Sequence, residues 1–512
     1  MAEMLPEAFV QRMQKMLGEE YQEFEAAFWQ PRVQGLRLNG LKGERKHLEE
    51  SCRQQFHLTP VPWVPEGFYY DAGERPGKHP YHEAGLYYIQ EPSAMAVSQL
   101  LDPKPGELVL DLCAAPGGKS TQIAGRMQGQ GLLVSNEIHP ARAKILSQNV
   151  ERMGAANVVV TNHDSAQLTR WFPEFFDKIV VDAPCSGEGM FRKDEAARAE
   201  WSLENVALCH RRQQEILDNA AKMLKPGGRL VYSTCTFAPE ENEGSIQAFL
   251  DAHPEFSIEV REGREFFDAG HPEWVPGGMG GRELQDTFRI WPHHTGGEGH
   301  YLASLRKADE SRMTAGGSGG AERAISEMPE RNQTLRGKAK GSAAGAGHPK
   351  DRTGQGLDRE IRKALELFCK ETICSMEGSG ESSSKFPWEQ KPGRYLLFGE
   401  QLYYVPEQMP DMKGMKVLRP GLHLGTAKKN RFEPSHGLAL FLKAEQGKQT
   451  VNLDGDGMDV IRYLKGETLP AEAGKESRKG WILVTVDGFS LGWAKQAGSM
   501  LKNHYPKGLR WM

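Results

Sequence analysis

The chain has 512 residues, of which 38% are hydrophobic and 26% charged, with a formal net charge of −4. This length exceeds what one hydrophobic core supports and indicates about three domains in an ordinary soluble protein. The small net charge excludes a uniformly basic nucleic-acid binder, so any such surface must be local. No run of about 18 apolar residues occurs, which excludes a membrane-spanning helix.

The cysteines and the N-terminus bear on the compartment and on metal binding. The seven cysteines are scattered, with no Cys-x-x-Cys pair. This pattern favours a reducing compartment over a disulfide framework and predicts no metal site. The first residues, MAEMLPEAFV, lack a basic region followed by an apolar core, so no secretory signal is expected. We therefore expect a cytoplasmic monomer with no membrane association.

Composition and periodicity divide the chain into segments. Residues 1–95 begin with a helical pattern over 5–30 and continue as a small α+β domain. Over 96–307, strands alternate with helices, which predicts a mostly parallel, doubly wound α/β sheet. Residues 308–356 contain no Phe, Trp or Tyr and are predicted to be a disordered linker. A connecting helix is expected within 357–385 and a β-rich module over 386–512.

The predicted sheet is built from short apolar runs. Its parallel strands are expected at 108–112, 132–136, 158–161, 179–181 and 230–233, with antiparallel additions at 288–291 and 301–305. Ligands of such sheets bind at the carboxyl ends of the strands. The residues that follow each strand are therefore the first candidates for a site.

A turn of small residues, DLCAAPGGKS at 111–120, follows the first strand. Small side chains let the backbone approach a ligand closely, and the following helix start offers free N–H groups. The turn is neither the dinucleotide fingerprint nor a phosphate-binding loop. Glu137 ends the second strand, where a carboxylate can bind both hydroxyls of a ribose, and Asp164 follows the third, suited to an adenine amino group. This ordered set predicts a nucleoside cofactor without pyrophosphate, and S-adenosylmethionine fits.

Two cysteines stand at the ends of neighbouring predicted strands. Cys185 lies in DAPCSG at 182–187, and Cys235 follows the last parallel strand in YSTCT. A lone cysteine at such a place is more often a buried packing residue. Two of them beside Asp182, at the edge that carries the predicted cofactor site, favour catalysis instead.

Thiols beside a methyl donor suggest one particular chemistry. Carbon 5 of cytosine is not nucleophilic, but a thiolate that adds to carbon 6 makes carbon 5 enamine-like and able to accept a methyl group. Asp182 at the N3/N4 edge of the base would stabilise the charge of the adduct. The target base would have to be unstacked or flipped to reach the thiol. The residues alone do not say which thiol is the nucleophile.

The stretches DLCAAPGGKS, DAPCSGEGMF and YSTCTFAPEENE together resemble the motifs of the RNA 5-methylcytosine methyltransferases, the Nol1/Nop2/Sun family. The resemblance covers residues 5 to 306. It implies a Rossmann-like class I methyltransferase sheet, S-adenosylmethionine as cofactor and an RNA-binding N-terminal domain. In that family the cysteine that matches Cys235 is the nucleophile, and the one that matches Cys185 assists product release.

The resemblance also assigns binding residues. The cofactor positions of the family match Cys113, Ala114, Ala115, Pro116, Gly117, Gly118, Lys119, Glu137, Asp164 and Asp182. The positions that flank the cytosine pocket match Gln90, Ser93 and Lys193. Cys113 is expected to line the cofactor pocket through its backbone.

The C-terminal module carries local basic stretches. The residues between 413 and 431 include Lys413, Lys416, Arg419, Lys428, Lys429 and Arg431 and no carboxylate. Near the end of the chain, Lys495, Lys502, Lys507 and Arg510 alternate with Trp493, Tyr505 and Trp511. Charge runs are usually solvated faces, but beside an RNA-modifying domain they favour phosphate contacts with aromatic stacking. The tail resembles the PUA-like domain of bacterial ribosomal RNA methyltransferases.

The sequence therefore predicts an S-adenosylmethionine-dependent RNA (cytosine-5-)-methyltransferase that acts on 16S ribosomal RNA or the small ribosomal subunit. A transfer-RNA target is an alternative with the same chemistry. A non-catalytic RNA-binding factor of ribosome assembly is another, against which the intact Cys185, Cys235 and Asp182 argue. A methyltransferase for proteins or small molecules would not need two thiols or a basic tail.

Overall fold

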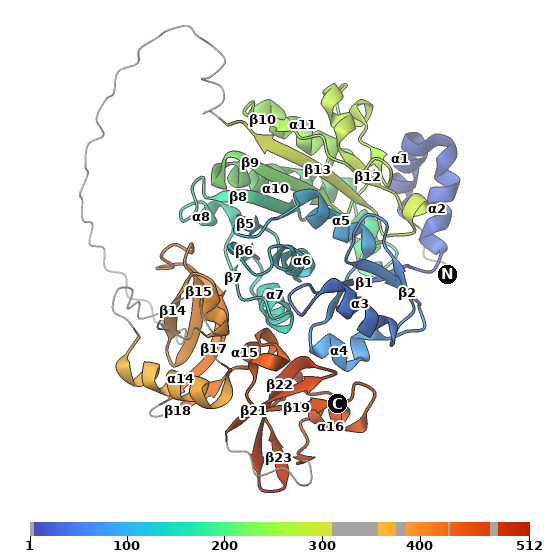
Figure 1. Cartoon of the computed structure of the whole chain (residues 1–512). Coiled ribbons are helices and arrows are strands. Elements are labelled where there is room, and N and C mark those ends of the chain that lie inside the picture. Colours follow the sequence, from blue (N-terminus) through green and yellow to red (C-terminus); the bar gives the residue numbers. More distant parts are fainter. Residues whose placement is uncertain (1–4, 310–356, 375–385, 429–430, 472–479) are drawn as a thin grey trace, which may run out of the picture.

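The computed structural model describes residues 5–309, 357–374, 386–428, 431–471 and 480–512 (Figure 1). The predicted linker at 308–356 lies outside these residues except for its first two positions. Residues 375–385 of the predicted connecting segment and the predicted RNA contact Lys429 also lie outside them.

A central sheet organises the molecule. Five of its strands are parallel in the order β9-β8-β5-β6-β7: β5 (Leu108–Asp111), β6 (Leu132–Asn136), β7 (Val158–Thr161), β8 (Phe176–Asp182) and β9 (Leu224–Thr234). Antiparallel strands continue the sheet beyond β9: β10 (Phe256–Ile258), β11 (Asp268–Ala269), β12 (Phe288–Ile290) and β13 (His300–Lys307). The predicted doubly wound sheet is confirmed. Its chain order reverses between β5 and β8, and such a switch point opens a crevice at the carboxyl ends of the strands.

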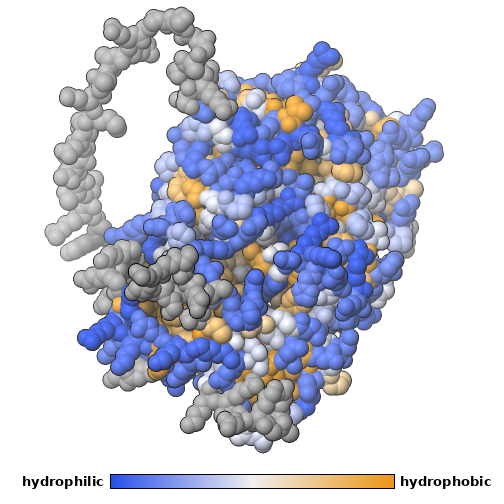
Figure 2. Space-filling model, viewed as in Figure 1, coloured by the Kyte–Doolittle hydropathy of each residue, from blue (hydrophilic) through white to orange (hydrophobic). Residues whose placement is uncertain are grey.

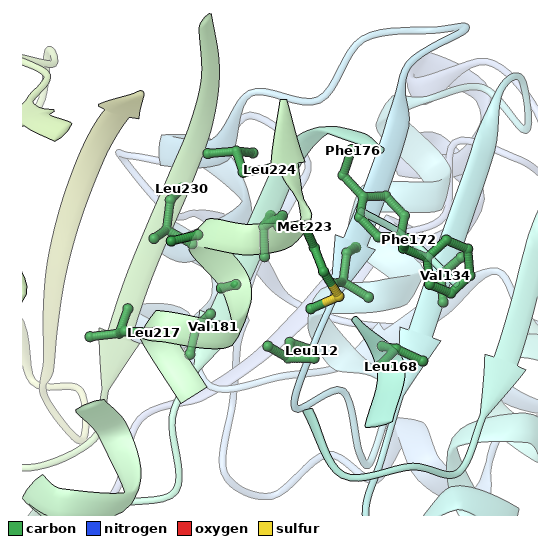
Figure 3. Packing of buried hydrophobic residues seen from close by; sticks show 14 of the residues in the cluster. Leu112, Val134, Leu168, Phe172, Phe176, Val181, Leu217, Met223, Leu224 and Leu230 are labelled. Atoms are coloured by element: carbon green, nitrogen blue, oxygen red, sulfur yellow. The ribbon is translucent and has the colours of Figure 1, made fainter. Parts of the chain in front are cut away.

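Both faces of the sheet are covered by helices because successive strand residues point to opposite sides. On one face, Val109 and Val180 pack with α5 (Pro92–Leu101), α6 (Gly118–Arg126) and α7 (Pro140–Arg152). On the other, Leu110 and Val181 pack with α8 (Ser165–Leu168), α10 (Leu203–Met223) and α11 (Glu243–Ala252). Figure 3 shows part of this second layer, where Leu217 and Met223 of α10 lie near Val181 and Leu230.

The N-terminal part differs from the expected single helix over 5–30. It forms α1 (Glu7–Leu17), a 3₁₀ turn at Gly18–Glu20 and α2 (Tyr21–Trp29). Gly18 has a φ of 55°, which lies outside the right-handed helical region and breaks the helix. The prediction missed this break because the apolar spacing continues across it.

A small antiparallel sheet follows the two N-terminal helices. Its order is β2-β3-β1-β4, with β1 (Gln34–Leu38), β2 (Leu58–Pro60), β3 (Gly67–Tyr70) and β4 (Tyr87–Ile89). The helices α3 (Arg45–Arg53) and α4 (Pro80–Glu83) complete it. The aromatic residues Phe68, Tyr69 and Tyr70 all lie in β3.

The C-terminal part contains two sheets. One has the order β14-β15-β17-β18, from β14 (Gly393–Phe398), β15 (Gln401–Pro406), β17 (Leu422–Lys428) and β18 (Arg431–Pro434). The other has the order β19-β21-β22-β23-β20, from β19 (Thr450–Leu453), β20 (Leu469–Pro470), β21 (Trp481–Val486), β22 (Phe489–Ala497) and β23 (Met500–Asn503). The helices α14 (Arg359–Thr372), α15 (His436–Phe441) and α16 (Met458–Leu464) pack around them.

One C-terminal strand joins the central sheet. β16 (Val417–Pro420) pairs antiparallel with β7, so that Val417 lies opposite Thr161. Arg419 of this strand is buried and forms an ion pair of 2.7 Å with Glu151 of α7. The prediction that Arg419 contacts RNA is therefore wrong, because its charge is used inside the fold.

The last sheet packs against the N-terminal domain, as Figure 1 shows for β22 and α16 beside α3 and α4. The Tyr81 hydroxyl donates to Asp487 at 2.8 Å, and the Tyr505 hydroxyl donates to Glu83 at 3.1 Å. Trp493 is 2% exposed and donates its ring N–H to the Ser435 carbonyl at 2.8 Å. The predicted RNA stacking by Trp493 and Tyr505 is therefore wrong, since both rings belong to the core.

In the described part of the chain, no helix is both long and apolar enough to cross a bilayer. On the face shown in Figure 2, hydrophilic residues predominate and apolar ones are scattered.

Candidate active site

A cavity of about 420 Å³ opens at the carboxyl ends of β5, β8 and β9. Among the predicted site residues, it is lined by Gln90, Cys113, Ala114, Ala115, Pro116, Gly118, Lys119, Asp182, Lys193 and Cys235. The structure thus brings together residues that are up to 145 positions apart, as expected for the switch point of such a sheet. Ser93, Gly117, Glu137, Asp164 and Cys185 do not line this cavity.

The two thiols face each other. β8 and β9 are parallel with Asp182 opposite Ser233, so the residues just beyond these strand ends lie level. Cys185 Sγ and Cys235 Sγ are 3.4 Å apart. The hydrogen bond to Cys235 and then burial raise the pKa of the Cys185 thiol well above its ordinary value. Cys235 lines the cavity, whereas Cys185 lies beside it.

Asp182 is held between two donors. Lys119 Nζ lies 2.7 Å from its Oδ2, and the Ser233 hydroxyl donates to its Oδ1 at 2.8 Å. Burial raises the pKa of Asp182, but the charges of Lys119 and His300 and the hydrogen bonds from Lys119 and Ser233 together outweigh it and hold the pKa below its usual value. Asp182 is therefore a carboxylate that accepts hydrogen bonds at the cavity wall.

The turn after β5 is shaped by its small residues. Gly117 has a φ of 112°, and a Cβ there would lie 3.1 Å from Leu146 of α7. The turn is tied to α7 because Arg142 donates to the Ala115 carbonyl and Asn149 to the Pro116 carbonyl, each at 2.8 Å.

Asp111, the last residue of β5, is hydrogen-bonded to the helix that follows the turn. Its Oδ2 accepts from the Ser120 hydroxyl at 2.6 Å, while its buried Oδ1 has no partner among the described residues. Burial raises the pKa of Asp111 to about 7. A buried carboxyl oxygen without a partner beneath a turn of small residues fits a site whose ligand supplies the missing polar contact.

The two other predicted cofactor acids lie at the same edge of the sheet. Glu137 is buried after β6, where its Oε1 accepts the His139 N–H at 2.9 Å. Asp164 precedes α8 and caps it, with Oδ1 accepting the Gln167 N–H at 2.8 Å. Each of these hydrogen bonds uses one carboxylate oxygen. Carboxylates at these two places are acceptors that suit the hydroxyls of a ribose and the amino group of an adenine along β6 and β7.

Of the three residues predicted to flank the base, two line the cavity and one does not. Gln90 lines the cavity, and its Oε1 accepts from the buried Arg37 guanidinium at 2.9 Å. Lys193 also lines it. Ser93 is fully buried and donates to Glu91 Oε1 at 2.9 Å, so the structure gives it a supporting position and no direct place at the cavity.

The acidic run of the YSTCTFAPEENE stretch is internal. Glu241, Asn242 and Glu243 are all fully buried. Glu241 accepts from the Ser186 N–H at 3.0 Å and from the Gln213 amide at 2.8 Å. Burial raises the pKa of Glu241 to about 7. Because Ser186 follows Cys185, this cluster fixes one thiol against the other.

Sequence reasoning missed Glu298 and His300, which both line the cavity. Glu298 lies just before β13 and His300 is its first residue. Tyr301 pairs with Thr234, which places His300 level with Cys235. The sequence did contain a signal for Glu298. It is an acid flanked by glycines, GGEGH at 296–300, directly ahead of the strand predicted at 301–305.

The sheet order, the small-residue turn and the carboxylates at successive strand ends define a Rossmann-like methyltransferase. Solved structures agree with this class. A methyltransferase homolog protein from Pyrococcus horikoshii superposes with a TM-score of 0.53 at 30% identity, covering 59% of this chain and 95% of that one. NSun6 from Pyrococcus horikoshii, solved with SFG, superposes with a TM-score of 0.51 at 22% identity, covering 60% and 99% of the two chains, which supports the fold.

Family models and relatives cover nearly the whole chain. The 16S rRNA methyltransferase RsmB/F model matches 98–306, and the model for the N-terminal domain of RsmF matches 5–92. The models of the first C-terminal domain and the PUA domain of RsmF match 368–442 and 450–511. Ribosomal RNA small subunit methyltransferase F of Vibrio cholerae is 30% identical over 99% of this chain and 97% of its own. The same enzyme of Shewanella baltica is 30% identical over 95% and 92%.

The chain therefore belongs to the RsmB/F family of RNA methyltransferases. This confirms the predicted family and the predicted fold class, including a PUA domain at the C-terminus. The PUA model covers the last sheet, and a separate model covers the part that contains β14 to β18.

Proposed function

We propose that this protein methylates carbon 5 of cytosine in 16S ribosomal RNA, with S-adenosylmethionine as methyl donor and a covalent bond between Cys235 Sγ and carbon 6. The observation that carries the proposal is the pair of sulfur atoms 3.4 Å apart beside a cavity that Asp182 and the small-residue turn also line. One thiol can attack the base while the second remains within reach of it for product release.

The chain's own residues suggest a division of roles. Cys235 lines the cavity and is the proposed nucleophile. Cys185 lies beside Cys235, and the hydrogen bond between the two thiols and burial raise the pKa of Cys185. Cys185 therefore stays a thiol while Cys235 reacts. It is the group proposed to assist product release. Asp182, ionised beside Lys119, would accept from the exocyclic amino group of the base.

The cofactor would be held by residues 113–119, Glu137, Asp164 and Asp182. When bound, S-adenosylmethionine supplies an electrophilic methyl group. The side chains of the turn are small and leave room for the cofactor. Glu137 offers a buried carboxylate for the ribose. These residues orient the donor toward the cavity in which Cys235 holds the base.

The N-terminal and C-terminal parts would bind the RNA. The structure reduces the number of basic residues that are available to contact it. Lys413 and Lys416 are exposed. Lys416 precedes β16, and its carbonyl accepts the N–H of Asn162 at 3.0 Å, at the carboxyl end of β7. Lys416 thus lies at the end of the sheet that carries the site, and Lys413 precedes it by three residues. Both are suited to phosphates.

Bisulfite sequencing of total RNA from cells with and without the gene tests the proposal. We expect one or more cytosines of 16S ribosomal RNA to be protected from conversion only when the gene is present. Protection confined to transfer RNA would move the target while keeping the chemistry. No gene-dependent protection in any RNA would refute the proposed function, and it would favour a non-catalytic role in ribosome assembly.

A further inference from the structure

Glu298 places one carboxyl oxygen, which has no partner among the described residues, in the wall of the cavity. The residue is 7% exposed, lies just before β13 and lines the cavity together with Cys235 and Asp182. Its buried Oε2 has no hydrogen-bond partner among the described residues. Burying a polar atom without a hydrogen bond is unfavourable and requires an explanation. In a cavity of this kind, a bound ligand that supplies the hydrogen bond is the simplest one.

The backbone holds Glu298 close to the proposed nucleophile. Both residues contact Gly189: a Cβ on this glycine would lie 2.7 Å from the Glu298 carbonyl oxygen and 2.9 Å from that of Cys235. The Gly189 N–H donates to the Cys235 carbonyl at 2.8 Å. The Glu298 N–H donates to Glu91 Oε1 at 3.1 Å. The acid and the thiol therefore have fixed main-chain positions on either side of one residue that has no side chain.

The surroundings shift this carboxyl group toward its neutral form. Burial, followed by repulsion from Glu91, raises the pKa of Glu298. Arg192, Arg32 and Lys193 act in the opposite direction and do not cancel this. A neutral carboxylic acid can donate a hydrogen bond, which a carboxylate cannot do.

Asp182 leaves half of the base edge without a partner. The Watson–Crick edge of cytosine offers an amino group at position 4, which donates, and a ring nitrogen N3, which accepts. Asp182 is ionised by its ion pair with Lys119, so it can bind the amino group but has no proton for N3. The addition of a thiolate to carbon 6 places electron density on N3, so a donor there would matter most in the transition state.

We propose that Glu298 donates a hydrogen bond to N3 of the cytosine that Cys235 attacks, while Asp182 accepts from the amino group. The inference rests on the proposed function and adds a catalytic residue to it. As the S–C6 bond forms, the C5=C6 electron pair becomes a C4=C5 double bond. The C4=N3 pair becomes a lone pair on N3, where the hydrogen bond from Glu298 stabilises its charge. When carbon 5 takes the methyl group, this lone pair restores the C4=N3 double bond.

The test compares Glu298→Gln with Glu298→Ala in the full-length protein, on ribosomal RNA from cells that lack the gene. A glutamine amide keeps a donor at this place, whereas alanine removes it. We expect Glu298→Ala to lower kcat about 100-fold or more, as the loss of one aligned donor does. We expect Glu298→Gln to stay within about tenfold of the wild type. Glu265→Gln, at an exposed site, is the matched control.

Binding of S-adenosylmethionine and the melting temperature should be unchanged in both variants, which separates a chemical defect from a folding defect. The rate of adduct formation with RNA that contains 5-fluorocytosine should fall with kcat in Glu298→Ala and largely persist in Glu298→Gln. A Glu298→Ala variant within threefold of the wild type would overturn the inference, and so would a Glu298→Gln variant as defective as it. A wild-type protein that forms no 5-methylcytosine would instead refute the proposed function.

Discussion

Lys119 and Asp182 form an ion pair of 2.7 Å between the helix that follows β5 and the end of β8. The pair closes one side of the cavity and keeps Asp182 ionised despite its burial. Removing the ammonium in Lys119→Met should leave burial as the dominant influence and raise the pKa of Asp182. The acidic limb of the pH–rate profile should therefore move to higher pH, and kcat/KM should fall. An unchanged profile would show that Asp182 does not depend on this partner, and Lys46→Met, at an exposed site, serves as the control.

The contact between the two thiols predicts a trapped intermediate. Cys185→Ala removes the group proposed to assist release while Cys235 can still attack the base. Incubation with S-adenosylmethionine and ribosomal RNA should then give a protein–RNA adduct that survives denaturing electrophoresis. The double variant Cys185→Ala/Cys235→Ala should give none. If Cys185→Ala accumulates no adduct and turns over normally, product release uses another group.

The exposed lysines ahead of β16 predict a specific defect in RNA binding. Lys413→Glu/Lys416→Glu should weaken RNA binding about tenfold or more at low salt. The slope of log Kd against the logarithm of the salt concentration should fall by about two, because two phosphate contacts are lost. Affinity for S-adenosylmethionine should not change. Lys363→Glu, which changes an exposed lysine of α14, provides the comparison. Equal effects of the two charge reversals would argue against a local RNA site at this edge.

Glu259 predicts a pH dependence of stability. Burial raises its pKa, but its bonds to Arg229 and the charge of Arg306 outweigh this and lower the pKa from 4.5 to about 2. The folded state thus binds fewer protons than the unfolded one between these values, so the stabilisation is present above pH 4.5 and is lost as pH falls toward 2.

Glu259→Gln should accordingly lower the free energy of unfolding at pH 7 by about 1 kcal/mol, a value reduced for the partial exposure of this ion pair. The difference between variant and wild type should shrink below pH 4 when urea unfolding is followed at several pH values. Glu262→Gln, at an exposed neighbouring site, should show no such trend. A constant difference across the whole range would contradict the assigned linkage.

The sheet and its strand-end chemistry were predictable because they rest on local patterns. Apolar runs such as 108–111 and 132–136 are buried on both faces, and this gives them a continuous signal. The residues that follow them have to share one edge, so Cys185, Cys235 and Asp182 converge by topology alone. Their order of action did not follow from the residues and came only from family resemblance.

The misjudged features depend on long-range contacts. Arg419, Trp493 and Tyr505 have the composition of an RNA surface, yet each is buried against another segment. Only the pairing of β16 with β7, the packing of α14 against Trp493 and the packing of the last sheet on the N-terminal domain reveal this. Gly18 breaks a helix whose apolar spacing continues past the break. Glu298 was overlooked because its place in the cavity wall depends on the pairing of β13 with β9.

The most direct test of the account is the identity of the residue bonded to the base. Ribosomal RNA transcribed with 5-fluorocytosine should stall the wild-type enzyme after methyl transfer, because fluorine at carbon 5 cannot be removed as a proton. Digestion with protease and nuclease followed by mass spectrometry should then find the modified nucleotide on the peptide that contains Cys235. A nucleotide attached to the Cys185 peptide, or methylated RNA with no attached peptide, would contradict the central claim.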